Sequence, residues 1–177
     1  EFYNDEEKFI MSLIKNDSTF IDIGANIGNL SLAAANIIND GKIIAIEAHP
    51  ETYRSMIQNI NDNAKNIKTY NLAVGDKPGE IYMTDFSADD CNHISKENVS
   101  NQPSINIDTI DNILGHDIDE IDLLKIDVEG FELMVLKGAR ITLSKTKYVY
   151  FELWDKLVEK FEYSGCEIID LLCKHNY

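Results

Sequence analysis

The chain has few cysteines and no long hydrophobic segment, and each shortage excludes a class of protein. Cysteine occurs three times in 177 residues, without the spacing of metal ligands, so a zinc site is not expected. Cys166 and Cys173 lie seven residues apart in a helical pattern, and we expect both thiols to be buried like small hydrophobes. No apolar run approaches the roughly 20 residues that span a bilayer, so no membrane partner is predicted.

Basic residues are also scarce. The chain carries 16 lysines and arginines against 31 aspartates and glutamates, which gives a formal net charge of -15. Such a charge opposes nonspecific attraction to phosphate backbones and anionic membrane surfaces, so we predict no nucleic-acid partner. Residues 1–15 have the pattern of an acidic amphipathic helix rather than of a basic leader with a long apolar core, and we therefore expect a cytoplasmic protein.

A composition of 44% hydrophobic and 27% charged residues is that of an ordinary globular chain, and the length suffices for one core. We expect a single domain over residues 1–177, with an N-terminal helix within residues 1–17. Short apolar runs alternate with longer amphipathic ones, which predicts an α/β fold, a Rossmann-like and mostly parallel sheet with helices on both faces. Strands are predicted at 19–23, 42–47, 67–72, 80–84, 104–107, 121–126 and 148–153, and helices at 5–15, 28–38, 50–63, 131–144 and 155–174.

A polar stretch, residues 85–103, separates two of the predicted strands. It is long for a loop in a compact domain, and such loops are usually functional or mobile, so we interpret it as a lid over a cleft. Asp85, Asp89 and Asp90 could bind a hard cation such as Mg²⁺ together with Asp127. We assign no metal site, because histidines and cysteines form no metal-binding pattern.

The first predicted strand ends in an acidic residue followed by two glycines, Asp22, Gly24 and Gly28. Small residues let a ligand approach the backbone closely, and amides at a helix start attract carboxylates or phosphates. The glycines lie four residues apart and do not form the GxGxxG pattern of dinucleotide-binding proteins. Because Asp22 would repel a phosphate and attract an ammonium group, the turn suits the zwitterionic end of an amino acid.

Two further features predict a nucleoside pocket at the same edge of the sheet. Glu47 ends the second strand, 25 residues after Asp22, where a carboxylate can accept hydrogen bonds from both ribose hydroxyls. Capping of the next helix is the alternative role of Glu47. Ala73 and Val74 follow the third strand and would form an apolar edge for adenine. Since the carboxyl ends of parallel strands meet at one edge, we expect these residues to share one cofactor cleft.

Carboxylates also follow the apolar run 121–126, in the segment LLKIDVEGFELMVLKGA. Asp127, Glu129 and Glu132 are candidates for a catalytic base, because carboxylates this close raise one another's proton affinity. The alternative for Glu132 is a first-turn position that the helix dipole favours. Lys125 lies inside the apolar run and is expected to pair with an acidic neighbour.

These segments together resemble the FkbM-type S-adenosylmethionine-dependent methyltransferases. The resemblance rests on FIDIGANIGNLSL, IEAHP, NLAVGD and LLKIDVEGFELMVLKGA, and it covers about residues 19–153. It is most specific in the last segment. It implies the class I methyltransferase fold, S-adenosyl-L-methionine as cofactor, and transfer of a methyl group to an oxygen of a small-molecule or glycan acceptor.

Transferred to the matching positions, the resemblance implies a set of site residues. Methyl transfer from a sulfonium is an in-line displacement, so the enzyme chiefly needs to position the reactants and to supply a base. In the resemblance, Asp22, Gly24, Asn26 and Gly28 hold the methionine end, Glu47 holds the ribose, and Asp127 faces the reacting centre. Together with the candidates from the strand ends, the predicted catalytic residues are Asp127, Glu129 and Glu152, the last forming an acceptor wall with Trp154, and the predicted cofactor-binding residues are Asp22, Gly24, Ala25, Asn26, Gly28, Glu47, Ala48, Ala73 and Asp127.

Three questions stay open at this point. Class I methyltransferases continue with a further strand and an antiparallel hairpin, whereas this sequence ends at Tyr177. We expect a sheet without that hairpin, whether the cause is a fragment, a lost C-terminus or a natural variant. A scaffold that binds the cofactor without turnover and a NAD-dependent dehydrogenase are the alternative functions. The acceptor and the oligomeric state are not predicted.

Overall fold

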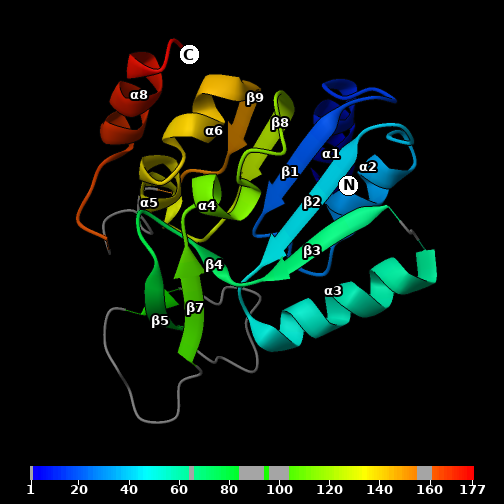
Figure 1. Ribbon diagram of the computed structural model, residues 1–177, viewed down its shortest axis with the longest axis horizontal. Coiled ribbons are helices and arrows are strands. Elements are labelled where there is room, and N and C mark those ends of the chain that lie inside the picture. Colours follow the sequence, from blue (N-terminus) through cyan, green and yellow to red (C-terminus); the bar gives the residue numbers. More distant parts are fainter. Residues whose placement is uncertain (1, 64–65, 84–93, 96–103, 155–160) are drawn as a thin grey trace.

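Five parallel strands form the central sheet in the order β3-β2-β1-β8-β9 (Figure 1). The computed structural model describes residues 2–63, 66–83, 94–95, 104–154 and 161–177. The chain runs outward from β1 to β3 and then returns to place β8 on the other side of β1, so the strand order reverses between β1 and β8. Ligands of open α/β sheets bind at such a reversal. The strands are β1 (Thr19–Ile23), β2 (Lys42–Glu47), β3 (Ile67–Asn71), β8 (Ile121–Ile126) and β9 (Thr146–Phe151).

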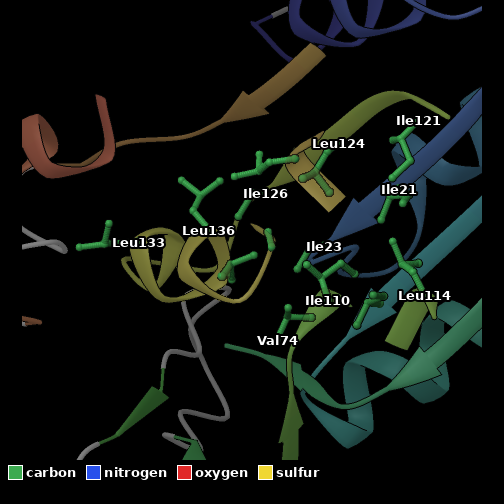
Figure 2. Packing of buried hydrophobic residues seen from close by; sticks show 14 of the residues in the cluster. Ile21, Ile23, Val74, Ile110, Leu114, Ile121, Leu124, Ile126, Leu133 and Leu136 are labelled. Carbon is green, nitrogen blue, oxygen red and sulfur yellow. The ribbon is translucent and has the colours of Figure 1, made fainter. Parts of the chain in front are cut away.

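Helices cover both faces of this sheet, which confirms the predicted α/β fold. Side chains alternate along each strand: Phe20 packs with α1 and α2, whereas Ile21 and Ile23 pack on the opposite face. Figure 2 shows the larger cluster on that second face, where strand residues meet Ile110 of α4 and Leu136 of α5. The helices are α1 (Phe2–Ser12), α2 (Asn29–Ala35), α3 (Pro50–Asn63), α4 (Ile110–Leu114), α5 (Glu132–Lys137), α6 (Arg140–Lys145) and α8 (Gly165–Lys174).

A second, mixed sheet lies beyond the carboxyl edge of the first. Its order is β4-β7-β5-β6, with β4 parallel to β7 and β5 antiparallel to both β7 and β6. In Figure 1 the arrowheads of β1 and β2 point toward it. The strands predicted at 80–84 and 104–107 therefore belong to a separate sheet. Apart from 94–95, the predicted lid lies outside the described residues. The strands are β4 (Ala73–Val74), β5 (Gly79–Met83), β6 (Ile94–Ser95) and β7 (Ser104–Asp108).

Two predicted helices differ in the structure. The helix predicted at 131–144 is divided into α5 and α6 around Gly138, where a Cβ would lie 2.0 Å from the Gly75 carbonyl oxygen. Of the helix predicted at 155–174, residues 155–160 lie outside the described part of the chain, residues 161–164 are not helical, and α8 begins at Gly165. A capping box formed by Ser164 and Glu167 fixes this start.

The prediction of buried thiols is wrong. Cys166 and Cys173 are exposed, because α8 turns Ile168 and Leu172 toward the core. Two residues spaced by four lie on one face of a helix. In α8 the buried face carries Ile168 and Leu172, and the two cysteines lie outside it. Among the described helices, none has both the length and the apolar character that crossing a membrane requires.

Candidate functional site

A cleft lies at the carboxyl edge of the central sheet, at the strand-order reversal. One part of its wall is polar and carries Asn26, Glu47, Asp127 and Glu129. Another part is apolar and consists of Leu72, Ala73, Val74 and Met83. Of the predicted site residues, those that line the cleft are Gly24, Asn26, Glu47, Ala48, Ala73, Asp127 and Glu129.

The turn after β1 joins three strand ends into one wall. The N–H groups of Gly24 and Ala25 both donate to the Ile46 carbonyl at the end of β2, at 2.9 and 3.0 Å. Gly24 adopts φ +74, and a Cβ at this position would lie 1.7 Å from the Asp127 carbonyl oxygen. Glycine is therefore required where the turn crosses the end of β8.

Glu47 is held by two backbone donors at the end of β2. Its Oε2 accepts the Asn26 N–H at 2.9 Å, and its Oε1 accepts the His49 N–H at 2.8 Å. Burial raises the pKa of Glu47 to about 6, against the lowering effect of these hydrogen bonds and of the Lys125 charge. A carboxylate offers about four lone-pair sites, so each oxygen can still accept a further hydrogen bond from a ligand.

A buried ammonium group lies behind the cleft. Lys125 Nζ is 3.3 Å from Asp22 Oδ1 and 3.4 Å from Asp127 Oδ2, and it donates to the Gly24 carbonyl at 2.9 Å. Burial lowers the pKa of Lys125, but the two carboxylates outweigh burial and raise this pKa above its usual value. The prediction that Lys125 pairs with acidic neighbours is confirmed. It connects β1 with β8, whose register places it beside Asp22.

Asp22 itself is fully buried and does not line the cleft. Its Oδ2 accepts the Ser31 hydroxyl at 2.7 Å, and its Oδ1 faces Lys125. Its charge is thus compensated within the protein, which weakens the argument that Asp22 attracts the ammonium group of a ligand. Asp22 can act on the cleft through Lys125 and the Gly24 turn.

The segment after β8 carries the remaining acidic residues of the predicted site. Asp127 and Glu129 line the cleft, and Glu129 adopts φ +52. Glu132 does not line it; this side chain is 2% exposed, and its Oε1 accepts the N–H groups of Val128 and Gly130. Burial raises the pKa of Glu132. Its contacts agree with the alternative role at the start of a helix.

Three other predicted residues lie outside the described lining. Ala25 is buried in a cluster with Met56 of α3, and Gly28 also approaches Met56. Glu152 is exposed, donates its backbone N–H to the Ile126 carbonyl at 3.4 Å, and accepts the Trp154 indole N–H at 2.9 Å. It therefore follows β9 beside the residue that precedes Asp127.

Several lining residues were not predicted, among them His49, Thr52, Leu72, Met83 and Val128. His49 lies within the quoted motif IEAHP, which was the available signal, whereas Met83 comes from the second sheet. In the described part of the chain, no cluster of three histidine, cysteine or acidic side chains is suited to a metal ion. Asp85, Asp89 and Asp90 lie outside it.

The sequence matches the Methyltransferase FkbM domain over residues 22–177. The chain belongs to this family. The match begins at Asp22, near the end of β1, and includes all residues of the cleft. Membership in the FkbM family implies S-adenosyl-L-methionine as the cofactor.

Curated relatives of this FkbM-family chain include methyltransferases, one of which is named for hexuronic acid. It is 24% identical over 148 residues to the hexuronic acid methyltransferase AglP of Haloferax volcanii, a match that covers 82% of this chain and 60% of AglP. It is 25% identical over 182 residues to the 2-O-methyltransferase NoeI of Sinorhizobium fredii, covering 92% of this chain and 74% of NoeI. The chain thus spans less than two thirds of AglP.

Solved structures show the same fold. The methyltransferase FkbM from Methylobacillus flagellatus superposes with a TM-score of 0.52 at 21% identity, covering 74% of this chain and 31% of that one. The precorrin-6y C5,15-methyltransferase from Geobacter metallireducens gives a TM-score of 0.57 at 15% identity. The match covers 97% of this chain and 70% of that one. The fold of this chain is therefore that of class I methyltransferases.

The cleft fits the cofactor that the family implies. Glu47 offers two hydrogen-bond acceptors at the end of the second strand, as a ribose with two hydroxyls requires. The apolar wall of Leu72, Ala73 and Val74 suits the adenine ring. The polar end at Asn26 and Asp127 offers partners for an amino-acid moiety.

Proposed function

We propose that this FkbM-family chain is one methyltransferase domain that transfers the methyl group of S-adenosyl-L-methionine to a hydroxyl oxygen of a sugar or another small molecule. The observation that supports it most is the cleft at the β1/β8 reversal, which combines Glu47, an apolar wall and two carboxylates. The name of AglP, a hexuronic acid methyltransferase, agrees with an acceptor of the sugar class, and the name of NoeI, a 2-O-methyltransferase, agrees with transfer to oxygen.

In this proposal, each part of the cleft has a role in binding the cofactor. Glu47 binds the ribose hydroxyls, and the wall that includes Ala48 and Ala73 contacts the adenine. Gly24 and Asn26 bind the methionine end through the turn that Asp22 and Lys125 support from behind. When bound, the cofactor supplies an electrophilic methyl group on a sulfonium.

Asp127 and Glu129 are the carboxylates that line the same cleft. A hydroxyl that attacks a methyl group must lose its proton, and a positioned carboxylate can accept it. We assign this role to the pair, with Asp127 held in place by Lys125 at 3.4 Å. The surrounding residues position the acceptor oxygen for in-line attack.

Glu152 and Trp154 form the proposed wall for the acceptor. Trp154 is 60% exposed, and its indole N–H is fixed by the Glu152 carboxylate at 2.9 Å. An exposed indole that is held in one orientation offers a flat apolar face to a sugar ring. It follows β9, which pairs with β8, and Asp127 follows β8.

Calorimetry with S-adenosylmethionine and S-adenosylhomocysteine, and with NAD as the control, tests the cofactor. We expect Glu47→Ala and Asp22→Ala to weaken binding. The matched control is Glu51→Ala, which removes an exposed glutamate from the first turn of α3. Binding of NAD alone would favour a dehydrogenase, and equal affinities in all variants would contradict the assignment of the cleft.

A transfer assay tests the reaction. Methyl-labelled cofactor is incubated with a panel of hexoses, uronic acids and small alcohols, and labelled product is measured together with S-adenosylhomocysteine. We expect Asp127→Asn and Glu129→Gln to slow transfer more than they weaken cofactor binding. Cofactor binding without product from any acceptor would instead support a scaffold without turnover.

A further inference from the structure

The segment that presents Glu129 has an unusual backbone. Glu129 adopts φ +52, and the next residue, Gly130, adopts φ +98. The left-handed region is rarely occupied by residues other than glycine, asparagine and aspartate. A glutamate remains there only when the surrounding structure holds it. Backbone contacts of the residues before and after Glu129 therefore help to fix the direction in which its side chain leaves the chain.

Those contacts come from Glu132. Its Oε1 accepts the Val128 N–H at 3.2 Å and the Gly130 N–H at 3.1 Å. The two amides flank Glu129, so one carboxylate oxygen fixes both sides of the residue. Glu132 is 2% exposed, and water cannot readily replace its hydrogen bonds.

Tyr163 completes the arrangement from the C-terminal segment. Its hydroxyl lies 2.8 Å from the Gly130 carbonyl oxygen and 3.2 Å from Glu132 Oε2, and it donates to these acceptors. Tyr163 is 7% exposed. The same segment is anchored by Phe161, whose ring lies edge-on against Phe131 with a centroid distance of 5.3 Å.

We propose that Glu132 and Tyr163 are positioning residues for methyl transfer, which hold the Val128–Gly130 segment so that the Glu129 carboxylate stays in the cleft. This inference rests on the proposed function. Neither residue lines the cleft. The segment that precedes α8 thereby contributes to catalysis although it is absent from the described lining. Displacing a reacting group by about 1 Å can reduce a rate by roughly 100-fold.

Tyr163→Phe tests the arrangement, with Tyr177→Phe as its matched control. Tyr163 precedes α8 and Tyr177 follows it. The Tyr177 hydroxyl also donates to backbone carbonyls, those of Leu143 and Thr146. Hydrogen exchange of the Val128 and Gly130 amides is measured first. We expect exchange to be at least about tenfold faster in Tyr163→Phe only, because local opening becomes easier. Unchanged exchange in Tyr163→Phe would overturn the proposal.

Kinetics then separate positioning from a general structural effect. With an acceptor from the panel, Tyr163→Phe should lower kcat by about 10- to 100-fold while the KM for the cofactor stays the same, and Tyr177→Phe should retain wild-type kcat. Adding Glu129→Gln to Tyr163→Phe should cause little further loss, since residues that act as a unit are not additive. Fully additive losses would refute the proposed role.

Glu132 provides a second series. Glu132→Gln keeps an oxygen that can accept the two N–H groups, so its kcat should lie between those of the wild type and Glu132→Ala. Equal losses in both variants would contradict the role of this oxygen. If the wild type binds no S-adenosylmethionine, the proposed function fails, whereas the exchange measurement still decides whether Tyr163 holds the segment.

Discussion

The buried carboxyl group of Glu47 makes cofactor affinity depend on pH. Hydroxyl donors bind the ionised carboxylate better than the protonated acid, so affinity should fall as pH decreases through the Glu47 pKa of about 6. At pH 5 roughly one tenth of Glu47 is ionised, and Kd should therefore rise about tenfold relative to pH 8, or ~1.4 kcal/mol. Calorimetry with S-adenosylhomocysteine between pH 8 and pH 5 measures this change.

The stability of the free protein should follow the opposite trend. The folded-state pKa of Glu47 lies above its ordinary value of 4.5. Its contribution is therefore fully present below pH 4.5 and is lost as pH rises through about 6. This loss amounts to about 2 kcal/mol at pH 7. The free energy of unfolding, measured with urea below pH 4.5 and at pH 7 in the wild type and in Glu47→Gln, should show this loss in the wild type only.

Glu47→Gln is the necessary control, because its amide has nearly the size of the carboxyl group but cannot ionise. The variant should bind weakly and should lose the pH dependence of Kd. A wild-type Kd that stays constant from pH 8 to pH 5 would refute the reasoning. The same would follow if the tenfold change persisted in Glu47→Gln, since another group would then cause it.

Two further predictions concern the residues that join β1 to β8. Lys125→Met leaves two carboxylates without their ammonium partner and should reduce the free energy of unfolding by about 3–5 kcal/mol, with part of the loss restored by adding Asp22→Asn. Urea melts measure both variants, and a stable single variant would contradict the charge compensation. Gly24→Ala should destabilise far more than Gly115→Ala in thermal melts. Both glycines have positive φ, but a Cβ at Gly115 meets nothing within 4 Å, so its substitution should cost only the backbone strain, about 1–3 kcal/mol. Similar losses would show that the clash with Asp127 is unimportant.

Much of the fold could be predicted because apolar runs and turn residues agree along the chain. The predicted bounds of β1, β2, α3 and β8 match the structure to the residue. Each of these strands is a short and mostly apolar run. In a parallel sheet covered on both faces, such runs are the expected strand pattern.

The errors arose where a distant contact determines the local structure. At Gly138, where the predicted helix breaks, the Gly75 carbonyl leaves no space for a Cβ, and no local pattern reveals this contact. The helix α4 was not predicted, although Thr109 accepts the Asn112 N–H as its cap, because five residues are too few for a clear helical period.

The candidate site shows the same division. Glu47, Asp127 and Glu129 line the cleft as the strand ends predicted. Asp22 does not, because its side chain turns into the protein, where Ser31 and Lys125 surround it. The direction of a side chain at a strand end depends on the packing of both neighbours, so the sequence alone could not distinguish a ligand contact from a buried partner.

The pairing of β1 with β8 also has a consequence for the order of folding. Thr19 donates to Asp122 across 103 residues of sequence, and Lys125 donates to Gly24 across 101. Contacts with such separation form slowly, because a long segment must first be closed into a loop. The first half of the chain therefore cannot present the cleft by itself. We expect cofactor affinity to appear in refolding only when the two halves of the sheet have joined. The rate at which ligand binding appears would therefore report the rate of that step.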